Sequence, residues 1–275
     1  MDDVIEAVAV RALEYRYKIW GFGEGPALLG VLRAGEHLGR PQWIDAVADL
    51  VAPSLHRPSD VTDHLIPVEV LTELARLRPA VDVSAAVARF RSAVSGPVHR
   101  PDLGAFVWVD CMHTDGPGLP GGRAAAAIEA AARLLASPSG LFSHGHDGVR
   151  PNGVHWGRGQ GWALHGLRAV DSPRLPALVT ALGRYEEDGR WRTVVDLDGA
   201  PVEHSVSAFV AAALPSTPMG KRALAAALDA LDGAGGLPVS EATPIGDAPS
   251  YLTRATGVFP WGQGPLLLAL LEASR

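Results

Sequence analysis

The sequence predicts an all-α fold in which six helical hairpins close into an (α/α)6 barrel, or toroid. Two observations carry this prediction: six motif-bearing segments recur about one helical hairpin apart, and helices of two kinds alternate between them. The chain has 275 residues, of which 47% are hydrophobic and 20% charged, so it can bury a large core. Composition does not divide the chain, and we expect one domain over residues 1–275.

Three of the six segments share a Trp-Gly signature. They begin at Trp20 (Trp-Gly-Phe-Gly-Glu-Gly), Trp156 (Trp-Gly-Arg-Gly-Gln-Gly) and Trp261 (Trp-Gly-Gln-Gly). Each is followed directly by a run rich in Ala and Leu, namely PALLGVL, WALHGL and PLLLALL. Internal similarity of this kind indicates a fold built from repeated units.

Three further segments occupy the same place in the pattern without that signature. They are Asp63-His-Leu-Ile-Pro, Asp110-Cys-Met-His and His204-Ser-Val-Ser-Ala. The six starts fall near residues 22, 63, 110, 157, 205 and 262. The intervals between successive starts are long enough for two helices of average length with their connections.

Amphipathic helices are expected between these starts. Their apolar residues recur at spacings of three and four, with charged residues on the other face, over 41–55, 83–94, 122–136, 172–187 and 220–233. Buried inner helices alternating with outer helices that keep one wet face are what a two-layer helical ring requires. An open solenoid is the alternative, but the irregular, motif-bearing starts favour a closed ring. The strand candidates, 105–110 and 191–197, are too short for a sheet core.

Charge and cysteine content limit the classes of function. The net charge is −6 and the sequence has no run of Lys or Arg, so we expect no nucleic-acid partner. Cys111 is the only cysteine, which rules out an intrachain disulfide. No apolar stretch approaches the ~20 residues that span a bilayer, and the start lacks a signal-peptide pattern. We therefore expect no membrane association, a cytoplasmic location, and a monomer or homodimer.

If each motif begins an inner helix, the motif side chains meet at one end of the barrel. That end presents unpaired backbone N–H groups and positive helix dipoles, which favour an anionic ligand. The polar and aromatic residues expected there are Trp20, Asp63, His64, Trp108, Asp110, His113, Asp115, His144, Trp156, Arg158, Trp162, His204 and Trp261. Flat aromatic faces with hydrogen-bonding groups between them suit a sugar ring.

Structural roles are the alternative for several of these residues. Asp63 and Asp110 also fit helix N-caps, and the tryptophans also fit a core. Arg158 lies between two glycines, a flexible setting that favours a functional role. Neither 113–115 nor 144–147 has the ligand spacing of a zinc site, so we predict no metal and no cofactor. The sequence contains neither a nucleophile elbow nor a phosphate loop.

These residues together resemble the unsaturated glucuronyl and rhamnogalacturonyl hydrolases, glycoside hydrolase families 88 and 105. The most specific match is Trp156-Gly-Arg-Gly-Gln-Gly-Trp162, which is similar to the Trp-Gly-Arg-Gly-Asn-Gly-Trp of those families. The resemblance covers nearly the whole chain in order. It also rests on Trp20 with its Gly-rich turn, Asp63-His-Leu-Ile-Pro, His99 and Trp108 before Asp110, Leu141-Phe-Ser-His144-Gly-His-Asp147, Gly189-Arg-Trp-Arg, Glu203-His-Ser-Val-Ser-Ala and Trp261-Gly-Gln-Gly.

The resemblance implies an enzyme that releases an unsaturated uronic acid from an oligosaccharide by hydrating its C4=C5 double bond. These enzymes do not use the two-carboxylate displacement of ordinary glycosidases. By resemblance, Asp110 is the general acid and then the base toward water, and Asp63 holds substrate hydroxyls or shares the proton. The same resemblance implies that His144, Arg158 and Trp162 bind the uronate carboxylate and the sugar ring. It adds Trp20, His99 and Trp108 to the substrate-binding residues.

Next to Asp110 the sequence departs from the family pattern. Cys111-Met-His113-Thr-Asp115 stands where an apolar run is usual, and we include His113 among the substrate-binding candidates. This departure favours one alternative, in which the chain acts on a small glycosylated or enol-ether metabolite. A second alternative, which also stays open, is a sugar-binding protein without turnover.

Overall fold

The computed structural model describes residues 1–17, 23–56, 65–94, 96–97 and 106–275. Four of the residues expected at the site, Trp20, Asp63, His64 and His99, lie outside these ranges. None of the described helices is long and apolar enough to cross a membrane.

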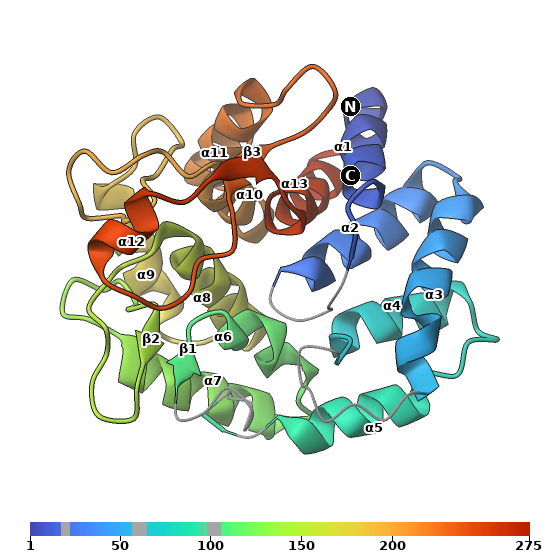
Figure 1. The fold of residues 1–275 in the computed structure, drawn as a ribbon, viewed down its shortest axis with the longest axis horizontal. Coiled ribbons are helices and arrows are strands. Elements are labelled where there is room, and N and C mark those ends of the chain that lie inside the picture. Colours follow the sequence, from blue (N-terminus) through green and yellow to red (C-terminus); the bar gives the residue numbers. More distant parts are fainter. Residues whose placement is uncertain (18–22, 57–64, 95, 98–105) are drawn as a thin grey trace.

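Twelve of the described helices form two concentric layers (Figure 1). The inner helices are α2 (Glu24–His37), α4 (Val68–Leu77), α6 (Cys111–Thr114), α8 (Gly157–Ala169), α10 (His204–Ala213) and α13 (Pro260–Ala273). The outer helices are α1 (Asp2–Leu13), α3 (Pro41–His56), α5 (Ser84–Ala93), α7 (Gly122–Leu135), α9 (Leu175–Arg184) and α11 (Pro218–Asp229). The predicted (α/α)6 toroid is therefore confirmed.

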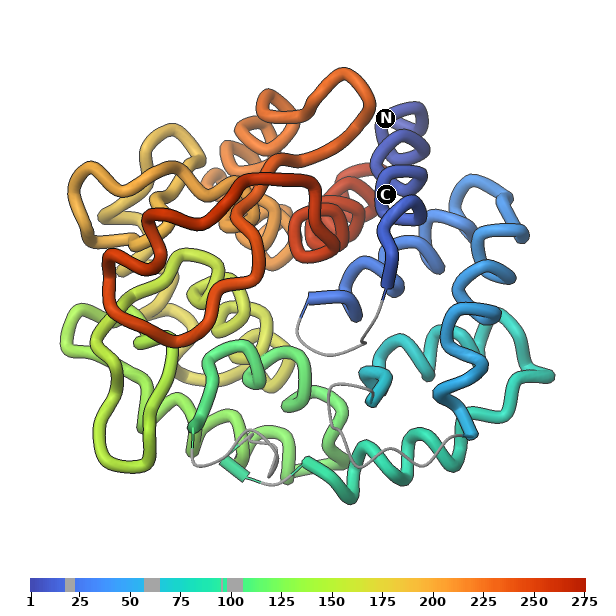
Figure 2. Tube along the Cα trace, in the orientation of Figure 1, coloured from blue at the N-terminus to red at the C-terminus, as the bar shows by residue number. Residues whose placement is uncertain are grey.

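The ring closes because α13 packs on α2 and α1, so the first and last helices lie side by side. Figure 2 shows the chain ends meeting there, after one circuit from blue to red. Going round the inner layer, α2 contacts α4, α4 contacts the 3₁₀ helix η3 (Gly116–Gly118) beside α6, and α8, α10 and α13 complete the circle.

Burial explains the two helix types. In α10 every residue from Ser205 to Ala213 is buried, since this inner helix has neighbours on all sides. The outer helix α1 buries Ile5, Val8, Ala9 and Ala12, one face at three- and four-residue spacing. The alternation seen in the sequence is thus the alternation between the two layers.

The third inner helix is much shorter than the others. Helix α6 ends at Thr114, and the Gly116-Pro117-Gly118 stretch that follows forms η3. Proline disfavours helical conformation in the residue before it and cannot donate a backbone hydrogen bond, so the helix cannot continue through this segment. The inner layer is completed there by a loop.

Glycines of the Trp-Gly motifs allow the inner helices to approach closely. A Cβ on Gly264 of α13 would lie 2.3 Å from the backbone nitrogen of Ala27 on α2. A Cβ on Gly157 would lie 2.5 Å from the carbonyl oxygen of Arg192. The expectation that the glycines around Arg158 provide flexibility is wrong, because both lie buried in α8 and leave room for neighbours.

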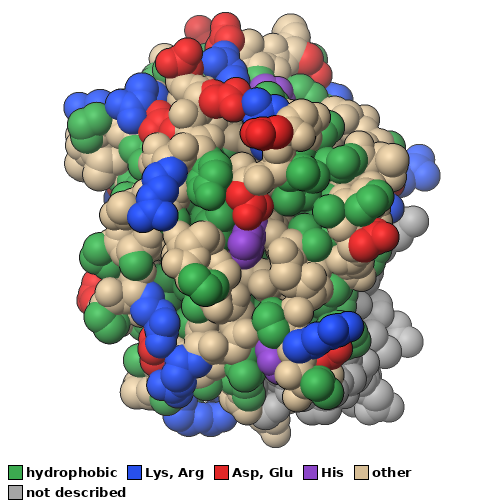
Figure 3. All heavy atoms as spheres, turned by 90° about the vertical axis from the view of Figure 1, so that its left-hand side faces the viewer, with side chains coloured by type: hydrophobic (Ala, Val, Ile, Leu, Met, Phe, Trp, Pro, Cys, Tyr) green, Lys and Arg blue, Asp and Glu red, His purple; other side chains and the backbone are tan. Residues whose placement is uncertain are grey.

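Within the described ranges, four short strands make two antiparallel pairs. Strand β1 (Val107–Trp108) pairs with β2 (Gly145–His146), with Trp108 opposite Gly145. Strand β3 (Pro238–Ser240) pairs with β4 (Thr256–Val258), and the chain between them carries the short helix α12 (Ala248–Leu252). On the face drawn in Figure 3, acidic and basic side chains are interspersed among apolar ones.

Candidate functional site

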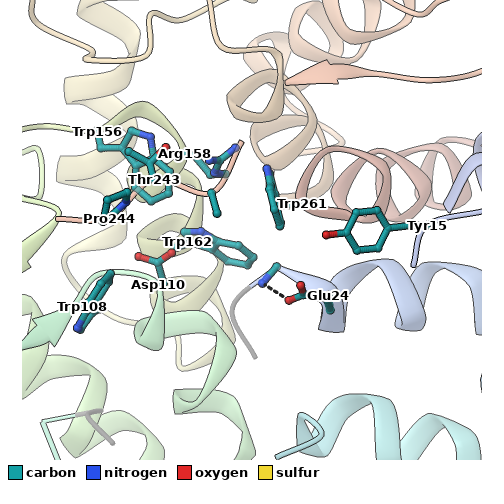
Figure 4. Close-up of a pocket in the computed structure, with 12 residues that line it drawn as sticks. Tyr15, Glu24, Trp108, Asp110, Trp156, Arg158, Trp162, Thr243, Pro244 and Trp261 are labelled. Atoms are coloured by element: carbon teal, nitrogen blue, oxygen red, sulfur yellow. Dashed lines mark hydrogen bonds between the residues drawn. The ribbon is translucent and has the colours of Figure 1, made fainter. Parts of the chain in front are cut away.

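A cavity of about 490 Å³ opens where inner helices α2, α6, α8 and α13 begin. Its described walls are Tyr15, Gly23, Glu24, Trp108, Asp110, Trp156, Arg158, Trp162, Ala242, Thr243, Pro244 and Trp261. Apolar rings with a few polar groups among them are typical of a small-molecule site. Helix N-termini therefore meet at this cavity, as the six-motif pattern predicts (Figure 4).

Asp110 reaches the cavity because the β1–β2 pair brings it beside His144. The Val109 N–H donates to the His144 carbonyl at 2.9 Å, which extends the pairing of Trp108 with Gly145. Asp110 occupies the N-cap position of α6, yet its side chain makes no capping hydrogen bond. The structural alternative for this residue, a plain N-cap, is therefore wrong, and its carboxylate is available to the cavity.

His144 is fully buried behind Asp110. Its Nε2 lies 3.3 Å from Asp110 Oδ2, a close contact that falls outside hydrogen-bond geometry, and neither atom has a hydrogen-bond partner among the described residues. The imidazole packs against the Trp156 ring at 4.3 Å between centroids and edge-on to Trp108 at 5.6 Å. His144 thus contacts the carboxylate from the side away from the cavity.

Arg158 is held by the loop that follows β3. Its two terminal nitrogens donate to the carbonyls of Ser240 and Glu241, each at 2.8 Å. Glu203 lies 3.8 Å away and itself accepts hydrogen bonds from the Ser240 N–H and hydroxyl. The guanidinium therefore fixes the wall formed by residues 242–244 while its charge remains at the cavity.

Two indole rings flank the same guanidinium. The Arg158 carbon Cζ lies 4.6 Å from the centroid of the Trp156 ring and 5.3 Å from that of Trp261. Burial lowers the pKa of Arg158, while Glu203 and Asp110 oppose that shift. Among the described residues that line the cavity, Arg158 is the cationic one, so a negative group of a ligand would meet it.

Trp162 separates the cavity from His113. The His113 ring stacks on Trp162 at 5.5 Å and meets His165 edge-on at 5.2 Å. His113 is buried, and it is absent from the described cavity lining. Burial lowers its pKa to about 4, so it is neutral at pH 7. Contrary to expectation, His113 supports the back of an aromatic wall and does not face the ligand.

The opposite wall contains two residues that we did not predict from the sequence. Tyr15 follows α1, and Glu24 begins α2 with 4% of its surface exposed. Figure 4 shows both on the side of the cavity away from Asp110, with Trp261 between. Burial raises the pKa of Tyr15, and the nearby Glu24 adds to the rise. Glu24 is the acidic residue of the first Trp-Gly motif, and that motif is the sequence signal that could have indicated it.

The structure thus brings together six of the residues expected at the site, with His144 directly behind them: Trp108, Asp110, Trp156, Arg158, Trp162 and Trp261. Within the described ranges no three His, Cys, Asp or Glu side chains form a group that would hold a metal ion.

Comparisons with known proteins identify the fold. No family model matches the chain, and no curated protein matches it either. A glycoside hydrolase of family 105 from C. acetobutylicum is 17% identical with a TM-score of 0.82, covering 99% of each chain. A possible family 105 member from Salmonella enterica serovar Paratyphi A is 19% identical with a TM-score of 0.78, covering 98% of this chain and 92% of the other.

The unsaturated glucuronyl hydrolase of Bacillus sp. GL1, responsible for the degradation of glycosaminoglycan, is 18% identical with a TM-score of 0.70. That match covers 100% of this chain and 97% of the other. The structural neighbours are thus members of families 105 and 88, the two that the sequence motifs resemble. This chain has the fold of the unsaturated glucuronyl hydrolases.

Proposed function

We propose that this chain is an enzyme that releases an unsaturated uronic acid from the non-reducing end of an oligosaccharide. The observation that carries the proposal is the buried Asp110–His144 pair at the base of a cavity walled by four tryptophans and Arg158. The likeness to solved glycoside hydrolases of families 88 and 105 supports it.

The proposed reaction begins at the C4=C5 vinyl ether of the sugar. The Asp110 carboxyl donates its proton to C4, which leaves positive charge shared by C5 and the ring oxygen. A water molecule then bonds to C5 and gives up a proton to the Asp110 carboxylate, so the acid is restored. The C5 hemiketal breaks its bond to the ring oxygen, C5 becomes a ketone, and the hemiacetal at C1 releases the second sugar.

In this scheme Arg158 meets the uronate carboxylate, and Trp108, Trp156 and Trp162 pack against the sugar. The carboxylate is conjugated to the double bond, so a cation beside it fixes the orientation of C4 toward Asp110. Asp63, Trp20 and His99, which the resemblance also assigns to substrate, remain proposals because they lie outside the described residues. A small oligosaccharide is therefore the proposed partner.

Turnover of unsaturated disaccharides tests the proposal. Disaccharides made by polysaccharide lyases from several glycans are mixed with wild type and with Asp110→Asn, and loss of the vinyl-ether absorbance is followed. Wild type should remove the absorbance from at least one disaccharide, and Asp110→Asn should be slower by about a thousandfold or more because it cannot supply the proton.

Glu129→Gln provides a matched carboxylate control, since Glu129 pairs with Arg174 outside the cavity. If neither wild type nor Asp110→Asn turns over any disaccharide, although both bind one, the protein is a binding protein and the enzyme proposal fails.

A further inference from the structure

The second ring nitrogen of His144, Nδ1, faces away from Asp110 and is hydrogen-bonded to Tyr251. Tyr251 lies on α12, 107 residues further along the sequence, and 1% of its surface is exposed. Its hydroxyl oxygen lies 2.6 Å from His144 Nδ1. The direction of this hydrogen bond decides which imidazole nitrogen carries the hydrogen.

Hydrogen bonds to Asn152 fix its amide orientation. Its oxygen Oδ1 accepts from the backbone N–H groups of Gly145 and Val154, at 3.3 and 3.4 Å. Its nitrogen Nδ2 donates to the Gly246 carbonyl at 3.1 Å. Backbone N–H groups only donate and carbonyls only accept, so the opposite amide orientation would break all three contacts.

The same Asn152 nitrogen donates to the Tyr251 hydroxyl oxygen at 3.2 Å, and the Gly246 N–H donates to it at 3.3 Å. The phenol oxygen therefore already accepts two hydrogens, and its own hydrogen remains for His144 Nδ1. Burial raises the pKa of Tyr251 to about 12, so the hydroxyl keeps that hydrogen at neutral pH. Nδ1 is consequently the acceptor, and in neutral His144 the hydrogen lies on Nε2.

We propose that Tyr251 is a positioning residue that holds His144 in the Nε2–H tautomer, with the hydrogen on the nitrogen that lies next to Asp110 Oδ2. This inference rests on the proposed function, because it gives the tautomer a role in the proton transfer from Asp110. Its basis is the bond network around the phenol oxygen together with the 3.3 Å approach of Nε2 to Oδ2.

The tautomer determines how Asp110 carries its proton. With Nε2 only 3.3 Å from Oδ2, a hydrogen on Nε2 disfavours a second hydrogen on that oxygen, so the carboxyl holds its proton on Oδ1. When this proton moves to C4, the carboxylate becomes negative and the Nε2–H···Oδ2 contact strengthens. The opposite tautomer would place a lone pair against Oδ2 and oppose the same step.

Nitrogen-15 NMR of the histidine rings measures the tautomer directly. The whole protein is labelled with [15N]histidine, and the His144 signals are assigned by their loss in His144→Asn. In spectra recorded at a pH where the His144 ring is neutral, wild type should show its hydrogen on Nε2. A hydrogen on Nδ1 in the wild type would overturn the proposal, whatever the variants do.

Tyr251→Phe removes only the hydroxyl group, and Tyr185→Phe is the matched control. Tyr185 caps α9, and its hydroxyl makes no hydrogen bond to a described residue. We expect Tyr251→Phe to mix the two His144 tautomers and to lower kcat by about fivefold to tenfold, the effect of losing one hydrogen bond. KM should change by less than about twofold, and Tyr185→Phe should match wild type.

Two outcomes would overturn the proposal: a kcat of Tyr251→Phe within about twofold of wild type, or a loss that appears in KM alone. A wild type with the Nε2–H tautomer but no turnover of any unsaturated disaccharide would refute the proposed function and leave the structural assignment of Tyr251 standing. The two failures are thus distinguishable.

Discussion

Replacing Arg158 by lysine tests whether one guanidinium holds the cavity wall. Arg158 donates from two different nitrogens to the carbonyls of Ser240 and Glu241, and it lies between two indole rings. Lysine keeps the charge but has one nitrogen, so it cannot reach both carbonyls in the geometry of the fork. The change therefore isolates the shape of the guanidinium from its charge.

The expected loss follows from these contacts. One hydrogen bond from a charged group contributes about 1.5–3 kcal/mol, and the reduced contact with the indole faces adds about 0.5–2 kcal/mol. We expect the free energy of unfolding to fall by about 2–5 kcal/mol, measured by urea denaturation followed by tryptophan fluorescence. KM for an unsaturated disaccharide should rise as well, because residues 242–244 of the wall lose their anchor.

Arg150→Lys is the matched control, because Arg150 is exposed; its free energy of unfolding should stay within about 0.5 kcal/mol of wild type. If Arg158→Lys lowered the free energy of unfolding by less than about 1 kcal/mol, the guanidinium fork would not be holding the loop, and this reasoning would be refuted.

Two further predictions concern the barrel itself. Burial lowers the pKa of His113 to about 4 and of His165 to about 3, against about 6.5 for an unfolded histidine. The unfolded chain therefore binds more protons, so acidification from pH 6.5 toward 4 should lower the free energy of unfolding, by up to about 1.4 kcal/mol per pH unit for each histidine. Urea unfolding across this range should show a shallower pH dependence for the double variant His113→Gln/His165→Gln, and equal dependence would contradict the burial argument. Gly264→Ala should lower the free energy of unfolding by about 1–3 kcal/mol, because the new Cβ meets the Ala27 backbone. Gly122→Ala is the control and should not lower it, because a Cβ at Gly122 has open space around it. Equal melting curves for the two variants would show that Gly264 is not required for close packing.

The inner-helix starts could be predicted because local sequence specifies them. The motifs near residues 22, 157 and 262 precede apolar runs without a polar face, which predicts helices that are buried on all sides. Helices α2, α8 and α13 do begin at these motifs, at Glu24, Gly157 and Pro260. The expected outer ranges 41–55 and 122–136 correspond to α3 and α7 within one residue at each end. The spacing of apolar residues and the apolar content of a segment depend only on residues close together in the sequence, so a single sequence is enough to predict these helices.

Features that depend on long-range contacts could not be predicted in this way. Tyr251 gave no local signal, because its partner His144 is 107 residues away. The β3–β4 pair joins short strands on either side of a 15-residue excursion, so no alternating run marks it. His113 was placed at the ligand because it follows Asp110 by three residues, whereas the turn of α6 directs it behind Trp162.

Two glutamines of the Trp-Gly motifs have structural roles. Gln160 of the second Trp-Gly motif is fully buried and bonds both backbone groups of Phe142. Gln263 of the third motif does the same for Leu237 and Gly235. Each glutamine ties a preceding loop to the start of an inner helix. These positions therefore stabilise the barrel, whereas Trp156, Arg158 and Trp261 of the same motifs line the cavity.

Deuterium incorporation tests the central claim most directly. Wild type converts an unsaturated disaccharide in D₂O, and the uronic acid product is examined by NMR and mass spectrometry, while product made in H₂O and then moved to D₂O measures background exchange. Hydration through Asp110 predicts one deuterium at C4 of the product above that background, formed as the double bond is lost. A product that keeps its C4=C5 bond and gains no deuterium at C4 would show ordinary displacement at C1 and would contradict the account.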